Sequence, residues 1–310
     1  MLPNFLLIGA EKAGTTSIHD YLRAHPQVFM ARVKEPLFFA FEGCKLGYKG
    51  PGDEEFNRRV VTSADAYAAL FAGAERYRAV GEASATYLFY SQSPERAAHY
   101  VPKAKLIVVL RNPADRAYSN FLHGIRARKE NLEFGAALKA EPERIAAGWS
   151  PFFSYRAKGW YHAQLSHWME YFPPEQFLFL LCDDLQARPM EVMRQIYGFI
   201  GVNPDFRPDV DVRYNISGKP LSPRLHELLK SNTAIHGLAR SVLPAKLRAR
   251  LKADITRWNL ARPIFSPRLR AQLLGEYAPD LDRLAAMIGR DLSHWTAPSR
   301  PVSALVLEDA

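Results

Sequence analysis

Cysteines and long apolar runs are both scarce in this sequence. Its 310 residues contain only Cys44 and Cys182, which lie far apart and fit no metal-ligand spacing. Two such cysteines favour free thiols in a reducing compartment, although a single disulfide stays open. No stretch approaches the roughly 18 uncharged apolar residues of a membrane span, and the first residues lack the basic region and apolar core of a signal peptide. We therefore expect a soluble, cytoplasmic protein without a transmembrane segment.

Acidic residues are outnumbered by basic ones, which gives a formal net charge of +9. Such a balance favours anionic ligands, but it also fits nucleic acid or an anionic membrane surface. The motifs below favour a small anionic ligand, so we expect no nucleic-acid partner. The amphipathic basic run at residues 246–252 leaves a peripheral membrane contact open, although a solvated helix face needs no partner. The oligomeric state cannot be read from the sequence.

Short apolar runs alternate with amphipathic stretches along most of the chain. The alternation predicts an α/β, P-loop-like three-layer fold, in which helices flank a central, mainly parallel sheet. From about Pro220 onward the pattern is helical only. We expect one domain over residues 1–310, with a nucleotide-binding core over about 1–220 and a helical extension over about 221–310. The predicted strands are residues 5–8, 79–81, 105–110 and 177–181, and the predicted helices are residues 15–22, 64–72, 94–100, 113–125, 159–172 and 190–200.

A glycine-containing loop follows the first predicted strand. Gly9 and Gly14 have the spacing of the two glycines in a P-loop, and Thr15 or Thr16 can cap the helix that follows. Glycines let backbone N–H groups turn inward, and a helix N-terminus adds partial positive charge. The loop therefore predicts a bound phosphate, with a simple helix-capping turn as the alternative.

The loop departs from the P-loop of nucleoside triphosphatases at its lysine. Thr15 stands directly after Gly14, where those enzymes need lysine, and the lysine is Lys12, inside the loop. They also need a carboxylate at a strand end to help hold magnesium. The clearest strand here ends at Arg111, a cation. The pattern favours an anionic nucleotide bound without a metal.

Two further segments predict anion binding. Arg111 lies at the carboxyl end of its strand, where open α/β sheets bind ligands, and Ser119 lies on the first turns of the next helix. Arginine offers a bidentate fork and serine a hydroxyl, so both can converge on one phosphate; a surface salt bridge of Arg111 is the alternative. Later, residues 215–220 form a short basic stretch in which Gly218 exposes backbone and Lys219 supplies charge.

Together, these motifs resemble the sulfotransferases that use 3′-phosphoadenosine 5′-phosphosulfate (PAPS). Residues 12–17 are similar to the family's 5′-phosphosulfate motif, and residues 111–119 to its 3′-phosphate motif. Residues 34–39, 159–173 and 217–220 resemble segments of the branch that contains the heparan sulfate sulfotransferases and their bacterial relatives. The resemblance implies direct in-line transfer of a sulfuryl group to a hydroxyl or amine. The product nucleotide would be adenosine 3′,5′-bisphosphate (PAP), with no metal required.

The resemblance also implies which residues bind the donor. Lys12 would neutralise charge that develops on the bridging oxygen and the leaving phosphate, as a catalytic group. The implied donor-binding residues are Lys12, Ala13, Gly14, Thr15, Thr16, Ser17, Arg111, Ser119, Ser217, Gly218 and Lys219.

Several residues are candidates for the general base that takes the acceptor proton. Glu35 matches the glutamate base of the heparan sulfate branch, although an ion pair with its neighbour Lys34 is an alternative role. Glu82 is the second candidate, and His123 or His162 is the third.

The acceptor is the least determined part. Branch resemblance implies a carbohydrate or glycosylated metabolite. A cluster of aromatic residues can line an acceptor cleft, although core packing explains such clusters equally well. Two other functions stay open: a magnesium-dependent P-loop kinase of a nucleoside or sugar, and a non-catalytic module that binds a nucleotide or polyanion. The aromatic residues are Trp149, Phe152, Phe153, Tyr155 and Trp160.

Overall fold

The computed structural model describes residues 1–209, 219–220, 260–261 and 264–296. Its centre is a five-stranded sheet in the order β2-β3-β1-β4-β5, with every neighbouring pair parallel. This confirms the predicted α/β class with a central parallel sheet. The strands are β1 (Phe5–Gly9), β2 (Val28–Met30), β3 (Ala79–Ala83), β4 (Lys105–Leu110) and β5 (Phe177–Leu181).

The strands are continuous apolar runs because helices cover both faces of the sheet. Every residue of β1 and β3 is buried. Phe5 pairs with Gly81 across the β1–β3 ladder, and a Cβ on Gly81 would lie 2.2 Å from the Phe5 ring. Glycine at position 81 is therefore required by the close approach of that ring.

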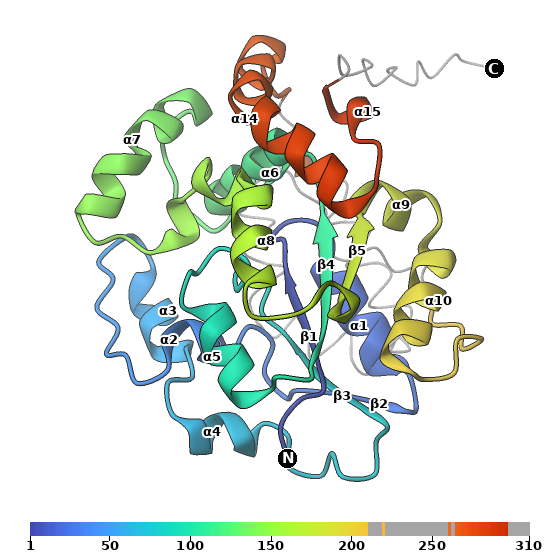
Figure 1. Cartoon of the computed structure of the whole chain (residues 1–310). Helices are drawn as coiled ribbons and strands as arrows, with labels where there is room; N and C mark the ends of the chain where they lie inside the picture. The colour runs from blue at the N-terminus through green and yellow to red at the C-terminus, as the bar shows by residue number, and fades with distance from the viewer. Residues whose placement is uncertain (210–218, 221–259, 262–263, 297–310) are drawn as a thin grey trace, which may run out of the picture.

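Helices connect the strands and form the outer layers. In Figure 1, α5 and α8 lie in front of the strands and α1 lies behind them. The Tyr197 hydroxyl of α10 donates to the Tyr21 carbonyl of α1, which ties these two helices together. The helices are α1 (Thr15–Ala24), α2 (Phe38–Phe41), α3 (Asp53–Arg59), α4 (Ala64–Ala69), α5 (Ser93–Tyr100), α6 (Pro113–Arg126), α7 (Phe134–Ala146), α8 (Tyr161–Met169), α9 (Cys182–Ala187), α10 (Pro189–Ile200), α14 (Pro267–Ile288) and α15 (Ser293–Thr296), with the 3-10 helices η1 (Pro151–Phe153), η2 (Ala157–Gly159) and η3 (Pro174–Gln176).

The structure departs from the sequence prediction in a few elements. The edge strand β2 was not predicted, because three residues are too short for a periodicity signal. The predicted helix over residues 159–172 is shorter, since α8 ends at Met169. The tail is not helical only, because β6 (Lys219–Pro220) pairs antiparallel with β7 (Leu260–Ala261). The predicted helices between residues 225 and 255 lie outside the described residues.

The C-terminal helix α14 packs directly on the sheet-covering helices. Both carboxylate oxygens of Asp280 accept backbone N–H groups of His162 and Ala163, which caps α8. The Tyr277 ring lies against Gly159, where a Cβ would approach it to 2.6 Å. Helix α14 is therefore part of the same packed body as the sheet. The division of the chain at about residue 220 stays a prediction.

The surface and the thiols agree with a chain of mixed charge and free cysteines. Cys44 is exposed, Cys182 is buried, and both are free thiols.

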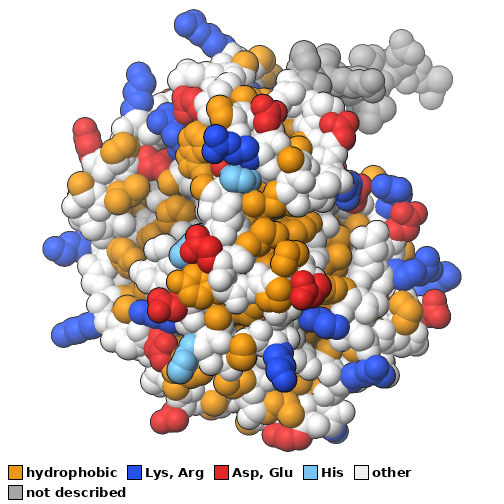
Figure 2. Space-filling model, in the orientation of Figure 1, with side chains coloured by type: hydrophobic (Ala, Val, Ile, Leu, Met, Phe, Trp, Pro, Cys, Tyr) orange, Lys and Arg blue, Asp and Glu red, His pale blue; other side chains and the backbone are white. Residues whose placement is uncertain are grey.

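Within the described residues, no helix is both long enough and apolar enough to cross a bilayer. On the face drawn in Figure 2, Lys and Arg side chains are spread around the periphery with Asp and Glu between them. The net positive charge forms no continuous patch on this face.

Candidate active site

The anion-binding loop connects β1 to α1, at the carboxyl end of the central strand. Lys12 and Gly14 have left-handed backbones, with φ of 69° and 96°. Gly14 is the residue that flanks α1, and no side chain caps this helix. The prediction that Thr15 or Thr16 caps it is wrong, because the non-helical turn falls on Gly14 and Thr15 is already helical. Among the described residues, nothing accepts from the backbone N–H groups of Gly14, Thr15 and Thr16.

Lys12 lies among other cations. Burial, partly offset by the charge of Glu11 and reinforced by the charges of Arg126, Arg111 and Lys34, lowers the pKa of Lys12 to about 8. Like charges that crowd together favour a bound anion, because an anion removes part of their mutual repulsion. The position of Lys12 therefore suits a polyanionic ligand.

His123 of α6 contacts the lysine directly. Its Nδ1 lies 3.4 Å from Lys12 Nζ, and because an ammonium group has only donors, Nδ1 is the acceptor. Burial and the charge of Lys12 lower the pKa of His123 to about 3. A base of that strength takes up a proton poorly at neutral pH, so His123 fits a partner of Lys12 better than a general base. His162 lies in the first turn of α8, and no described contact joins it to Lys12 or Glu35.

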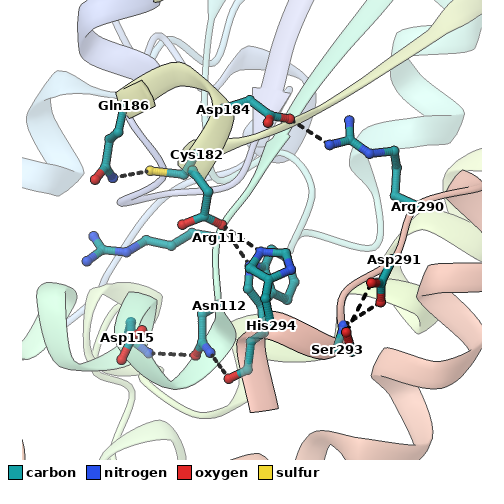
Figure 3. Close-up of polar contacts among 12 residues, drawn as sticks. Arg111, Asn112, Asp115, Cys182, Asp184, Gln186, Arg290, Asp291, Ser293 and His294 are labelled. Atoms are coloured by element: carbon teal, nitrogen blue, oxygen red, sulfur yellow. Dashed lines mark hydrogen bonds and ion pairs between the residues drawn. The ribbon is translucent and has the colours of Figure 1, made fainter. Parts of the chain in front are cut away.

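The structure brings Arg111 and the loop together. Arg111 follows β4, and its Nη1 donates to the carbonyl oxygen of Lys12 at 3.1 Å. The Tyr161 hydroxyl donates to the Arg111 carbonyl at 3.0 Å. In Figure 3 the Arg111 side chain leads away from the contacts around His294. No carboxylate pairs with Arg111 in the part of the chain that the structure describes, so the surface salt bridge considered from the sequence is not found there.

Ser119 is buried in α6, the helix that starts where β4 ends. Asn112 caps this helix, because its Oδ1 accepts from the N–H groups of Ala114 and Asp115 at 3.0 and 3.1 Å. The backbone of β6, which contains Lys219, lies beside α6. Ser217 and Gly218 lie outside the described residues.

A C-terminal clamp, formed by Trp295, Arg270 and Arg290, holds the segment around Asn112. The Asn112 amide donates to the Trp295 carbonyl at 2.7 Å, and the Trp295 indole donates to Asp183 at 2.8 Å. Arg270 pairs with Asp115 at 2.9 Å and Arg290 with Asp184 at 2.7 Å. Figure 3 shows the contacts of Asn112 and of Arg290 with Asp184, which join the segment around α15 to the residues that follow β4 and β5. The clamp was not predicted, because its only signal in the sequence was the acidic pair after β5.

Glu35 lies at the carboxyl end of β3. Its N–H donates to the Ala83 carbonyl at 2.9 Å, and its Oε2 accepts from the Ala85 N–H at 3.0 Å. Its Oε1 pairs with Lys34 Nζ at 3.0 Å, with 21% of the Glu35 side chain exposed. The ion pair considered from the sequence is therefore present. Because both side chains keep part of their surface exposed, the pair contributes little stability and the carboxylate stays accessible.

Glu82 is buried inside the sheet, with no exposed surface. Its carboxylate accepts hydrogen bonds from Tyr67 at 3.3 Å and Ser84 at 2.9 Å. Burial, with a smaller contribution from the charge of Glu35 and against the hydrogen bonds that the carboxylate accepts, raises the pKa of Glu82 to about 7. A carboxyl group so enclosed cannot touch an acceptor, which leaves Glu35 as the accessible candidate.

The aromatic cluster lies in the core or packs against it. Phe153 and Tyr155 are at most 1% exposed, and the Trp160 ring packs on Tyr277 at 5.1 Å between centroids. Phe152 packs edge-on against His123, at 5.6 Å between centroids. Core packing therefore accounts for Phe153 and Tyr155, while Phe152 lies against His123, the side chain that contacts Lys12. Across the described residues, no three His, Cys, Asp or Glu side chains gather in a way that could hold a metal ion.

Comparison with known proteins identifies the family. A model of the sulfotransferase domain matches residues 2–213. The chain belongs to the sulfotransferase family. It is 34% identical over 216 residues to the human bifunctional heparan sulfate N-deacetylase/N-sulfotransferase 3, covering 66% of this chain and 23% of that protein. The corresponding enzyme 1 of Caenorhabditis elegans is 28% identical over 222 residues, covering 70% of this chain and 24% of that protein. The chain thus spans about a quarter of the length of these curated relatives.

A solved structure covers far more of this sulfotransferase. The crystal structure of a sulfotransferase from Alicyclobacillus acidocaldarius matches with a TM-score of 0.76 and 34% identity, over 96% of this chain and 100% of that one. These findings confirm the predicted family, the P-loop-like fold and the transferase class. They do not favour the kinase or the non-catalytic binding module.

Proposed function

We propose that this sulfotransferase moves a sulfuryl group from PAPS to a hydroxyl or amine of a carbohydrate or glycosylated metabolite. The observation that carries the proposal is the hydrogen bond from Arg111 to the Lys12 carbonyl, which brings two cationic residues together where the neighbouring strands β1 and β4 end. The carbohydrate acceptor is supported by the names of the relatives, which are heparan sulfate enzymes.

The donor site fits a nucleotide with anions at two ends. The unpartnered N–H groups of residues 14–16, together with the Lys12 ammonium, offer donors to a 5′-phosphosulfate. Arg111 and Ser119 would hold the 3′-phosphate, because α6 begins where β4 ends and carries Ser119 on its second turn. Lys219, with Ser217 and Gly218, would close over the nucleotide. The backbone of Lys219, in β6, lies beside α6.

The transfer would proceed in one displacement. The acceptor oxygen or nitrogen attacks sulfur, the bond from sulfur to the bridging oxygen of the phosphosulfate breaks, and PAP leaves. Lys12 stabilises the charge that develops on the bridging oxygen. The Glu35 carboxylate takes the acceptor proton as the new bond forms. No metal has a role in these steps.

Ligand-dependent melting tests the donor. We expect PAP to raise the melting temperature of the chain more than ATP with magnesium or a heparin-like polyanion does, because a ligand that binds only the folded state stabilises it. Selective stabilisation by ATP with magnesium would instead support the kinase, and stabilisation by the polyanion alone would support the binding module.

Transfer of labelled sulfate from PAPS to a panel of glycans and glycosylated metabolites tests the acceptor. We expect turnover on at least one carbohydrate, and strongly reduced turnover after Lys12→Ala or Glu35→Gln. If both variants keep wild-type turnover on the true acceptor, the roles of Lys12 and Glu35 are wrong.

A further inference from the structure

A buried ion pair beneath the anion-binding loop has no part in the steps above. Lys158 Nζ, from η2, contacts Glu11 Oε2 at 2.5 Å, and the Lys158 side chain is 4% exposed. Glu11 directly precedes Lys12 in the loop. Lys158, which lies 147 positions further along the chain, therefore holds the loop through the Glu11 carboxylate.

The pair lies in a strongly polar, enclosed setting. Arg116 of α6 is fully buried and lines the same small recess as Glu11, Lys158 and Gln164. Although burial raises the pKa of Glu11, the ion pair with Lys158 and the charges of Lys12 and Arg116 lower it to about 2. Glu11 is therefore ionised throughout the neutral range.

Glu11 matters because of what surrounds Lys12. Of the charged groups that act most strongly on Lys12 among the described residues, Glu11 alone is negative. The groups that face Lys12 from the neighbouring elements are Arg111 after β4, His123 and Arg126 on α6, and Lys34 after β2. Without Glu11, the ammonium would lie among cations and a neutral imidazole only.

We propose that Lys158 is a positioning residue for sulfuryl transfer. By pairing with Glu11, it fixes the anion-binding loop and keeps next to Lys12 the negative charge that holds this lysine protonated. The inference rests on the proposed function for its catalytic consequence. The predicted effect of Glu11 on the protonation of Lys12 concerns the free protein and can be measured without turnover.

A double variant can separate the proposed electrostatic role of the Glu11–Lys158 pair from a purely structural role. Replacing both members of a buried pair by neutral groups of similar size is often nearly neutral for stability, whereas removing one member leaves an unpaired buried charge. The double variant Glu11→Gln with Lys158→Met therefore removes the negative charge beside Lys12 while sparing the fold. Lys158→Arg keeps the pair and is the matched control.

The first measurement is the protonation of Lys12 in the free protein. Competitive labelling with acetic anhydride across pH, read by mass spectrometry of the peptide that contains Lys12, gives the midpoint of its deprotonation. We expect the midpoint to fall by roughly one pH unit in Glu11→Gln and in the double variant, since an opposite charge nearby shifts a pKa by about that much or more. Lys158→Arg should stay at the wild-type midpoint.

The second measurement is the pH profile of kcat/KM for PAPS, which reports groups of the free enzyme. Activity should be lost as the pH rises through the Lys12 pKa, and this alkaline limb should move to lower pH in the same two variants. A folded double variant that keeps the wild-type labelling midpoint and alkaline limb would overturn the inference. A wild-type chain that neither binds PAP nor transfers sulfate would contradict the proposed function instead, and the labelling midpoints would still decide the electrostatic part.

Discussion

The carboxyl ends of β1 and β4 differ sharply from the carboxyl end of β3. The first region gathers cations, with Lys12 and Arg111 joined by a hydrogen bond. The second gathers carboxyl groups, with Glu35 partly exposed and Glu82 fully buried. Because all of these strands are parallel, both regions lie at the same edge of the sheet. The difference separates the two tasks of the proposed reaction, in which cations hold the donor and a carboxylate accepts the acceptor proton.

The comparison depends most on the assignment of Glu35 as the general base, which its enclosed neighbour Glu82 can test. We expect Glu35→Gln to lower kcat by about 10²- to 10⁴-fold, the usual contribution of a general base, while Glu82→Gln keeps most of the activity. Steady-state kinetics on the identified acceptor, with both variants at saturating PAPS, checks this. Equal losses in the two variants would remove the distinction between the exposed and the enclosed carboxyl group.

The cationic side depends on Lys12. We expect Lys12→Ala to lower kcat by about 10²- to 10³-fold, because it removes one donor from the charge that develops in the transition state. Lys103→Ala is the matched control, since Lys103 is an exposed lysine after α5. Comparing kcat of the three proteins on the same acceptor tests this, and a Lys12→Ala enzyme as fast as the control contradicts the role.

Glu82 should leave a signature in stability. The pKa of Glu82 in the folded protein is about 7, above the ordinary value of 4.5. Its contribution to the free energy of unfolding is therefore fully present below about pH 4.5 and is lost as the pH rises through about 7. The loss is about 3 kcal/mol, because one pKa unit corresponds to about 1.4 kcal/mol. Urea unfolding at pH 5 and pH 8 should show the wild type losing stability relative to Glu82→Gln. Parallel pH curves for the two proteins would argue against a protonated Glu82.

Arg111 and Ser119 should determine recognition of the 3′-phosphate. We expect Arg111→Met to raise the KM for PAPS by about 10- to 100-fold, because a hydrogen bond to a charged group contributes about 1.5–3 kcal/mol. Ser119→Ala should have a smaller effect. The preference for PAPS over adenosine 5′-phosphosulfate, which lacks the 3′-phosphate, is the sharper readout. Both variants should lose part of it, and an unchanged preference would place the 3′-phosphate elsewhere.

The smallest expected effect concerns the clamp at Asn112. Asn112→Ala removes the cap of α6 and the bond to Trp295, so it should lower the unfolding free energy by about 1–2 kcal/mol. Asn112→Asp keeps the capping oxygen but loses the Nδ2 donor, so it should lose only part of this. Chemical denaturation of the three proteins separates the cap from the clamp. Identical losses would show that the cap contributes nothing.

Much of the fold could be predicted because its signals are local. The apolar runs of β1, β4 and β5 are dictated by burial on both faces of a parallel sheet, and their ends locate Lys12 and Arg111 without any structure. The edge strand β2 was missed, since its three residues carry no periodicity. The cap of α1, predicted at Thr15 or Thr16, was misplaced because Gly14 takes the left-handed turn that precedes the helix.

The sequence by itself determined the family, four of the five strands of the sheet and the positions of the loop and the strand-end arginine, since each depends on residues that are neighbours in the chain. Only the tertiary structure decided which contacts those residues make. Lys12 meets His123 across 111 positions and Glu11 meets Lys158 across 147. Glu35 and Glu82 look alike in the sequence, but packing leaves one accessible and encloses the other. Burial and charge pairing depend on which segments meet in space, and local patterns do not record that.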